Sequence, residues 1–184
     1  LPAYSLKIGF HPMDFTQING EMNMMIVDRV VEMLDLQEDD SVLDLFCGLG
    51  NFTLPIATKV NSVTGVEASQ EMVERAKENA SKNKISNVEF YAEDLYKLPV
   101  TKAWTTGKYT KVMLDPPRTG ASEILPTIVS KKPEKIIYVS CNPSTLARDT
   151  KILHGNDYKL KSAGVMDMFP HTSHVESIAE FERK

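Results

Sequence analysis

The sequence has few cysteines, no long hydrophobic run and no surplus of basic residues. Two cysteines, Cys47 and Cys141, among 184 residues are too few for a disulfide framework and are typical of a reduced, cytoplasmic protein. No apolar run approaches the ~18 residues of a membrane helix and no signal peptide is evident, so we expect neither a membrane span nor secretion. The net charge of −4 lacks the basic surplus typical of nucleic-acid-binding proteins.

Internal repeats, low-complexity tracts and linkers are also absent. A chain of 184 residues is therefore expected to form one domain, which can bury roughly 70% of its unfolded surface without disulfides or metal. We expect a helical lead-in over residues 1–36 and a core over 37–184. Nothing in the sequence implies an obligate protein partner.

Short apolar runs alternate with amphipathic stretches along the chain. Strands are predicted at 41–46, 61–67, 87–92, 110–115 and 135–140, with helices over 21–36, from 52, over 70–84, near 120–130 and over 144–154. The tail has no helix between its last two runs, "YKLKSAGVMD" and "HVESIAEFER", which are expected to pair antiparallel. The pattern predicts an α/β, Rossmann-like fold: a mostly parallel seven-stranded sheet with an antiparallel C-terminal strand and helices on both faces.

In such sheets ligands bind outside the carboxyl ends of the strands. After the first strand, "DLFCGLGNF" (44–52) contains Gly48 and Gly50, which let the backbone approach a ligand closely. Glu67 ends the second strand 19 residues after Gly48, where a carboxylate can accept both hydroxyls of a ribose. Proteins that bind NAD also use a glycine turn followed by such an acid, but the pattern D-x-F-x-G-x-G resembles the first motif of S-adenosylmethionine-dependent methyltransferases.

The fourth strand is followed by "DPPRTG" (115–120). Amino-group methyltransferases often carry Asp-Pro-Pro followed by an aromatic residue, whereas here Arg118 follows. A guanidinium suits a phosphate or a base edge better than a neutral amine, which weakens that interpretation without excluding it.

The fifth strand ends in "YVSCNPSTLARD" (138–149), which places Cys141 at the same edge of the sheet. Most cysteines at strand ends are small buried hydrophobic residues, but the neighbouring motifs favour an open, reactive position. Ser144 is predicted to cap the following helix, whose amino terminus would favour the thiolate.

Together "LDLFCGLGNF", "DPPRTG", "YVSCNPSTLARD" and "DMFPHTSHVES" resemble the RNA uracil-carbon-5 methyltransferases, and the resemblance covers essentially the whole chain. The last two motifs are most similar to the enzymes acting on large-subunit ribosomal RNA. The resemblance implies S-adenosylmethionine as cofactor and RNA as partner, with Cys141 as nucleophile and Glu176 as base. It also implies cofactor contacts from Gln17, Phe46, Gly48, Gly50, Asn51, Glu67, Asp94 and Asp115, and substrate contacts from Arg118, Asn142 and His171.

The chemistry explains the need for these residue types. Carbon 5 of uracil is too weak a nucleophile to attack a methyl sulfonium, but addition of a thiolate to carbon 6 turns the ring into an enolate that can. A base must then remove the proton at carbon 5, and the family pattern implies a pKa of Glu176 raised by partial burial. His171, His174 and Glu176 could also suggest zinc, but three residues at this spacing are weak support, and we expect no metal.

The chain departs from the family in two respects. Ribosomal-RNA members typically carry an amino-terminal RNA-binding β-barrel and a cysteine cluster that holds a 4Fe-4S centre, and neither is present in this sequence. We therefore expect a catalytic domain of a longer protein that binds RNA poorly alone. Three functions stay open: an RNA uracil methyltransferase on ribosomal or transfer RNA, an amino-group methyltransferase, and a catalytically silent module with a cofactor fold.

Overall fold

The computed structural model describes residues 1–11, 20–97, 103–167 and 175–184. Its helical elements are η1 (Pro2–Tyr4), α1 (Gly20–Leu34), α2 (Thr53–Ala57), α3 (Gln70–Lys82), η2 (Ala103–Thr106), α4 (Leu125–Ser130) and α5 (Pro143–His154). Its strands are β1 (Ser41–Leu45), β2 (Ser62–Glu67), β3 (Val88–Ala92), β4 (Lys111–Leu114), β5 (Lys135–Ser140), β6 (Tyr158–Met166) and β7 (Glu176–Arg183).

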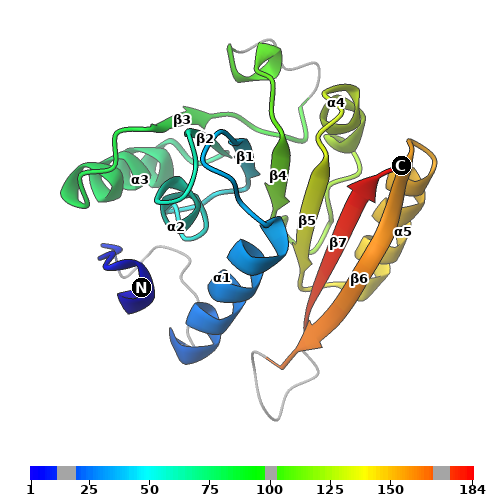
Figure 1. The fold of residues 1–184 in the computed structure, drawn as a ribbon, viewed down its shortest axis with the longest axis horizontal. Coiled ribbons are helices and arrows are strands. Elements are labelled where there is room, and N and C mark those ends of the chain that lie inside the picture. Colours follow the sequence, from blue (N-terminus) through cyan, green and yellow to red (C-terminus); the bar gives the residue numbers. More distant parts are fainter. Residues whose placement is uncertain (12–19, 98–102, 168–174) are drawn as a thin grey trace.

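The seven strands form one sheet in the order β3-β2-β1-β4-β5-β7-β6, which Figure 1 shows from the green β3 to the orange β6. Pairing is parallel from β3 through β5, whereas β7 pairs antiparallel with both β5 and β6. The predicted fold class, with its antiparallel C-terminal strand, is therefore confirmed. The chain order reverses between β1 and β4, which places the expected ligand site beside their carboxyl ends.

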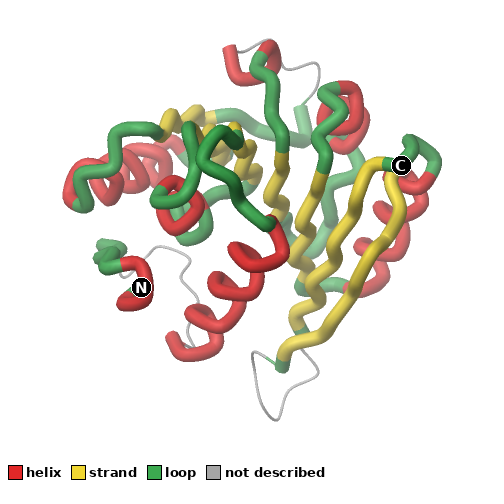
Figure 2. The backbone as a smooth tube through the Cα atoms, in the orientation of Figure 1, coloured by secondary structure: helices red, strands yellow, loops and turns green. Residues whose placement is uncertain are grey.

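Helices cover both faces of this sheet (Figure 2). Alternate residues of the strands point to opposite faces and therefore belong to different hydrophobic clusters. Val42, Met113 and Ile137 pack on the face that α1 covers. Their neighbours Leu43 and Leu114 pack on the opposite face. Because every β1, β4 and β5 residue but one is buried, these strands read as continuous apolar runs rather than as alternating ones.

Helix α1 lies where the helical spacing in the sequence predicts it. Val27, Val30, Val31 and Leu34 are all buried and belong to the core. The helix ends at Leu34, and Asp35 follows with a left-handed φ of 50°. Its terminal carbonyls are satisfied by two lysines from the sheet: Lys135 Nζ donates to Met33 O at 2.8 Å, and Lys111 Nζ donates to Asp35 O.

One predicted helix differs from the observed one. Helix α4 covers only Leu125–Ser130, because the residues from 115 to 121 form a separate loop after β4. Helix α2 begins within one residue of its predicted start and has Pro55 in its first turn as predicted, where the missing N–H of proline costs nothing.

Candidate active site

The turn between β1 and α2 has an unusual backbone. Phe46, Gly48 and Gly50 adopt left-handed conformations with φ of 63°, 54° and 88°. A left-handed phenylalanine is strained, and such strain is concentrated at functional sites. The predicted glycine turn is therefore present, and its conformation requires the two glycines.

Glu67 lies against this turn from the end of β2. Its Oε2 accepts a hydrogen bond from the backbone N–H of Gly48 at 3.2 Å, and its Oε1 accepts one from the N–H of Ser69 at 3.1 Å. Ser69 in turn caps α3 by accepting from Met72 N–H, as the sequence predicts. These bonds orient the carboxylate, and each oxygen keeps a lone pair for a ligand.

Asn51 follows the turn and is tied to α1. Its amide group exchanges two hydrogen bonds with that of Asn23, at 2.8 and 3.0 Å. The pair fixes the amino-terminal half of α1 beside the turn. Gln17, which the sequence also predicts as a cofactor contact, lies outside the described residues.

The loop after β3 contributes an acid and an aromatic ring. Asp94 accepts from Tyr96 N–H at 3.1 Å and forms an ion pair with Lys97 at 3.0 Å, and the hydrogen bond from Lys97 lowers the pKa of Asp94. The Tyr96 ring lies 5.9 Å from that of Phe46 at an angle of 48°. Tyr96 was not predicted from the sequence, although an aromatic residue two positions after Asp94 is a signal that could have indicated it.

Asp44 lies inside β1 and is completely buried. Its Oδ2 accepts a hydrogen bond from Thr53 Oγ1 at 2.5 Å, whereas Oδ1 has no partner among the described residues. Burial raises the pKa of Asp44 to about 7, with the charge of Glu67 adding to the effect. Sequence reasoning noted this acid only as part of a motif, because burial of a single carboxyl group cannot be read from spacing.

Strands β5 and β7 bring Cys141 and Glu176 together. Their register pairs Ser140 with Ser177, so the next positions, Cys141 and Glu176, face each other at the carboxyl end of β5. Glu176 is 8% exposed, and Cys141 is intermediate in burial. Two residues that stand 35 positions apart in the sequence thus share one end of the sheet.

The electrostatic surroundings of Cys141 disfavour the thiolate. The pKa of the thiol is raised, first by burial and then by the charges of Glu176 and Asp115, while the charge of Arg118 and a backbone hydrogen bond of Cys141 act in the opposite direction. Burial and the neighbouring carboxyl groups thus outweigh the groups that favour the thiolate. The effect of the helix terminus itself stays a prediction.

The two carboxyl groups beside Cys141 also have raised pKa values. Burial, followed by the charges of Glu176 and Asp44, raises the pKa of Asp115 to about 8. Burial alone raises the pKa of Glu176. Near neutral pH Asp115 therefore retains its proton, which removes one of the negative charges that face Cys141.

Asn142, not Ser144, caps α5. Its Oδ1 accepts from Ser144 N–H at 3.1 Å, so the predicted cap is wrong by two residues. Pro143 occupies the first helical position, where its fixed φ favours the helix, and this displaces the cap to the residue before it. Asn142 Nδ2 also donates to the backbone carbonyl of Arg118 at 3.0 Å, and the Arg118 side chain is exposed. His171 lies outside the described residues.

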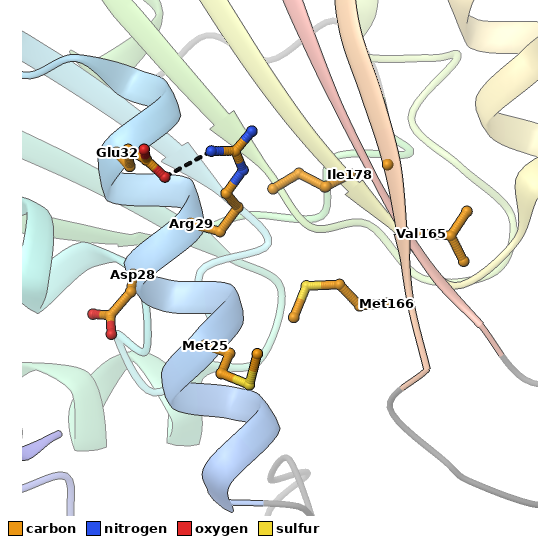
Figure 3. A pocket seen from close by; sticks show the side chains of 8 residues that line it. Met25, Asp28, Arg29, Glu32, Val165, Met166 and Ile178 are labelled. Atoms are coloured by element: carbon orange, nitrogen blue, oxygen red, sulfur yellow. Dashed lines mark hydrogen bonds and ion pairs between the residues drawn. The ribbon is translucent and has the colours of Figure 1, made fainter.

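A groove of about 650 Å³ lies between α1 and the β6-β7 pair (Figure 3). Met25, Met166 and Ile178 point into it, whereas Arg29 is paired with Glu32 on the helix at 2.6 Å. None of the predicted site residues that the structure describes lines this groove. It adjoins them, however, since Met166 pairs with Glu176 across the two strands.

Within the described ranges, no group of three or more His, Cys, Asp or Glu residues has the arrangement of a metal site, and His171 and His174 fall outside those ranges. None of the described helices combines the length and apolar character needed to cross a bilayer.

Comparison with solved structures defines the class of the domain. The Pyrococcus abyssi tRNA (uracil-54, C5)-methyltransferase, solved with S-adenosyl-L-homocysteine, superposes with a TM-score of 0.79 at 32% identity, over 94% of this chain and 41% of its own. TYW2 from M. jannaschii, solved with AdoMet, superposes with a TM-score of 0.67 at 19% identity, which shows the fold alone. The domain is a Rossmann-like methyltransferase fold.

Sequence comparison identifies the family. A sequence model described as tRNA (uracil-5-)-methyltransferase matches residues 7–184, so the chain belongs to that family. The 23S rRNA (uracil(1939)-C(5))-methyltransferases RlmD of Methylococcus capsulatus and Francisella tularensis subsp. novicida are 55% and 54% identical over 184 residues. They match 100% and 99% of this chain, which spans 42% and 41% of their lengths.

Proposed function

We propose that this domain transfers a methyl group from S-adenosylmethionine to carbon 5 of uridine in large-subunit ribosomal RNA. The observation that carries the proposal is the pair of Cys141 and Glu176 at facing positions of β5 and β7, with Asp115 close to both. Because the chain spans about two fifths of its curated relatives, activity and RNA binding are proposed for the longer protein that contains such a domain.

The residues at the β1 and β2 ends fit an adenosyl cofactor. Glu67 presents a carboxylate at the position of a ribose-binding acid, beside a left-handed turn whose glycines leave room for a ligand. Phe46 and Tyr96 offer aromatic surface on the same side. When bound, S-adenosylmethionine supplies an electrophilic methyl group on a sulfonium.

Cys141 is proposed to add to carbon 6 of the uracil ring. The thiolate forms an S–C6 bond, and the electron pair of the C5–C6 double bond moves into the enolate, so that carbon 5 becomes nucleophilic and accepts the methyl group. The raised pKa of Cys141 implies that positive charge beside the sulfur favours formation of the thiolate. Arg118 supplies such a charge, and the sulfonium of bound S-adenosylmethionine would add a second one.

Glu176 is proposed to remove the proton from carbon 5. As that C–H bond breaks, its electron pair restores the double bond and expels the Cys141 thiolate, which completes the cycle. Partial burial raises the pKa of Glu176 and so makes its carboxylate a stronger base. Asp115, protonated near neutral pH, is the nearest alternative proton carrier.

Ribosomal RNA is favoured over transfer RNA by the degree of similarity. The relatives named as 23S rRNA enzymes are 50% to 55% identical over the chain, whereas the Pyrococcus tRNA enzyme is 32% identical. An amino-group methyltransferase is less well supported, because N-methylation requires no covalent nucleophile and the residue after Asp-Pro-Pro is Arg118.

Mapping of 5-methyluridine in cells that lack the full-length gene tests the substrate. We expect one site in large-subunit ribosomal RNA to lose its methyl group and to regain it when the gene is restored, but not when the restored gene carries Cys141→Ala. Loss from transfer RNA alone would move the assignment to the transfer-RNA reaction. Unchanged 5-methyluridine in both RNA classes would refute the proposed function.

A further inference from the structure

The loop that follows β4 is held through its backbone. Side chains from two other segments bind the main chain of four consecutive residues, 118–121. The bonds run from Asn142 Nδ2 to Arg118 O at 3.0 Å, from Arg148 Nη2 to Thr119 O at 2.9 Å, from Tyr96 Oη to Gly120 O at 2.8 Å, and from Ala121 N to Asp149 Oδ2 at 2.7 Å. Such dense support is unusual for an exposed loop, which normally has few fixed contacts.

Three of these four supports come from α5 or from its cap. Asp149 is the central one, since it is completely buried and also accepts hydrogen bonds from Tyr138 Oη at 2.7 Å and Arg148 Nε at 2.8 Å. The helix that starts directly after Cys141 therefore fixes the loop of Arg118. Helix and loop form one unit, which we call the α5 clamp (Asn142, Arg148 and Asp149 with residues 118–121).

Gly120 shows how closely the two parts of the clamp pack. Its φ is +80°, and a Cβ there would lie 2.6 Å from Arg148 Nη2 and 2.7 Å from Asp149 Oδ2. Any side chain at this position would push the loop away from α5. The glycine of "DPPRTG" and the Arg-Asp pair of "TLARD" are thus parts of the same contact.

The clamp matters because of what it places beside Cys141. The charged groups that face this thiol are Glu176 from β7 and Asp115 and Arg118 from the clamped loop. Of these, only Arg118 favours the thiolate, and its exposed side chain has no ion pair of its own to fix it within the described part of the chain. The location of its charge therefore depends on where the backbone of the loop is held.

We propose that Asp149 is a positioning residue, which holds residues 118–121 on α5 and thereby keeps the guanidinium of Arg118 beside the sulfur of Cys141. The proposal rests on the proposed function only in that Cys141 is taken as the reactive group. Asp149 touches neither substrate nor cofactor, so its effect reaches Cys141 through Arg118.

The rate at which iodoacetamide alkylates Cys141, followed against pH, tests this in the domain itself. Peptide mass spectrometry separates Cys141 from the buried Cys47. We expect Arg118→Gln to slow alkylation at pH 7 about threefold and to move the profile to higher pH, because an exposed charge acts modestly through solvent. Asp149→Asn should produce a similar slowing, and the double variant should be no slower than Arg118→Gln alone.

The direction of the change separates positioning from direct electrostatics. Removing the negative charge of Asp149 would by itself ease formation of the thiolate and speed alkylation, so slowing indicates that Arg118 has moved. Asp157→Asn is the matched control: the same substitution at an exposed position after α5, where we expect an unchanged rate.

If Asp149→Asn fails to fold, Arg148→Gln is the second test variant, since this change removes the bond to Thr119 but keeps the buried carboxylate of Asp149. We expect a smaller slowing that disappears when Arg118 is already replaced. Faster alkylation in Asp149→Asn, or a full additional slowing on top of Arg118→Gln, would overturn the proposal. Because alkylation requires no methyl transfer, this result is independent of whether the methylation test succeeds.

Discussion

Buried carboxyl groups are stabilised differently at the two ends of the parallel strands. At the amino ends, which we call the paired edge, Lys111 lies 2.6 Å from Asp40, and Lys135 lies 3.0 Å from Glu180. Burial alone would raise the pKa of these two acids, but hydrogen bonds from the lysines and their neighbours leave both lowered. At the carboxyl edge, where the parallel strands end, Asp44 and Asp115 have no ion pair among the described residues, and burial raises their pKa to about 7 and about 8.

This difference indicates which edge serves stability and which serves chemistry. The paired acids stay ionised, and the lysines that pair with them also bind the carbonyls at the end of α1. Acids without a cation are destabilised as anions and can bind or release protons near neutral pH, which is useful only where a reaction or a ligand needs them. One sheet thus places the stabilising ion pairs and the proton-binding acids at opposite ends of its strands.

Removing a lysine at the paired edge should have the largest effect. Lys111→Met leaves Asp40 buried without its cation and frees the carbonyl of Asp35, so we expect the free energy of unfolding to fall by about 3 to 5 kcal/mol. Chemical denaturation measures it. Lys159→Met, at an exposed lysine 3.9 Å from Glu182, should change stability by less than ~0.5 kcal/mol. Equal effects at the two lysines would contradict the comparison.

The pH dependence of stability should differ in sign between the edges. Native Asp44 keeps its proton up to about pH 7, whereas the unfolded chain releases it near pH ~4, so its contribution to stability falls as the pH rises between these values. Native Asp40 releases its proton earlier than the unfolded chain does, so its contribution is lost on acidification.

Denaturation of Asp44→Asn and Asp40→Asn from pH 4 to 8 checks this. Relative to wild type, Asp44→Asn should gain a few kcal/mol between pH 4 and 7, since about 1.4 kcal/mol accompanies each pKa unit. Relative to wild type, Asp40→Asn should lose the least free energy of unfolding at the acid end of the range. Parallel curves for the two variants would show that the edges do not differ.

The cofactor acid should have an intermediate effect. We expect Glu67→Ala to weaken S-adenosylmethionine binding by about 1.5 to 3 kcal/mol, the range for lost charge-assisted hydrogen bonds. Calorimetry on the folded domain measures this. Glu71→Ala, at the exposed second residue of α3, is a matched control that should bind normally. Unchanged affinity in Glu67→Ala would remove this residue from the site.

RNA binding by the domain alone should show the smallest effect. With a net charge of −4 we expect weak binding of target RNA and a shallow dependence on salt, because few phosphates are neutralised. Titrations at several salt concentrations measure the slope. Tight binding with a steep slope would contradict the expectation that most RNA contacts belong to the remainder of the longer protein.

Much of the fold follows from local pattern. Continuous apolar strands alternating with helices predicted the parallel sheet, and the glycine turn and Ser69 cap were predicted at their observed positions. That Cys141 and Glu176 share one site was predicted only through the family resemblance. No spacing rule connects two residues whose strands meet through long-range pairing.

The electrostatics could not be predicted in this way. The raised pKa of Cys141 depends on carboxyl groups from two other segments, and the cap at Asn142 depends on the competition between Pro143 and Ser144 for the first helical positions. The hydrogen bonds between α5 and residues 118–121 likewise require a three-dimensional structure. The roles of all the site residues remain predictions, and Gln17 and His171 also lie outside the described residues.

Trapping of a covalent complex between the full-length enzyme and RNA tests the central proposal most directly. In Glu176→Gln the amide keeps the shape of the side chain but loses its basicity, so addition and methyl transfer proceed while the proton at carbon 5 stays. Incubated with target RNA and S-adenosylmethionine, this variant should accumulate a methylated protein-RNA complex that survives denaturing electrophoresis, and Cys141→Ala should form none. Full methylation by Cys141→Ala would contradict the account.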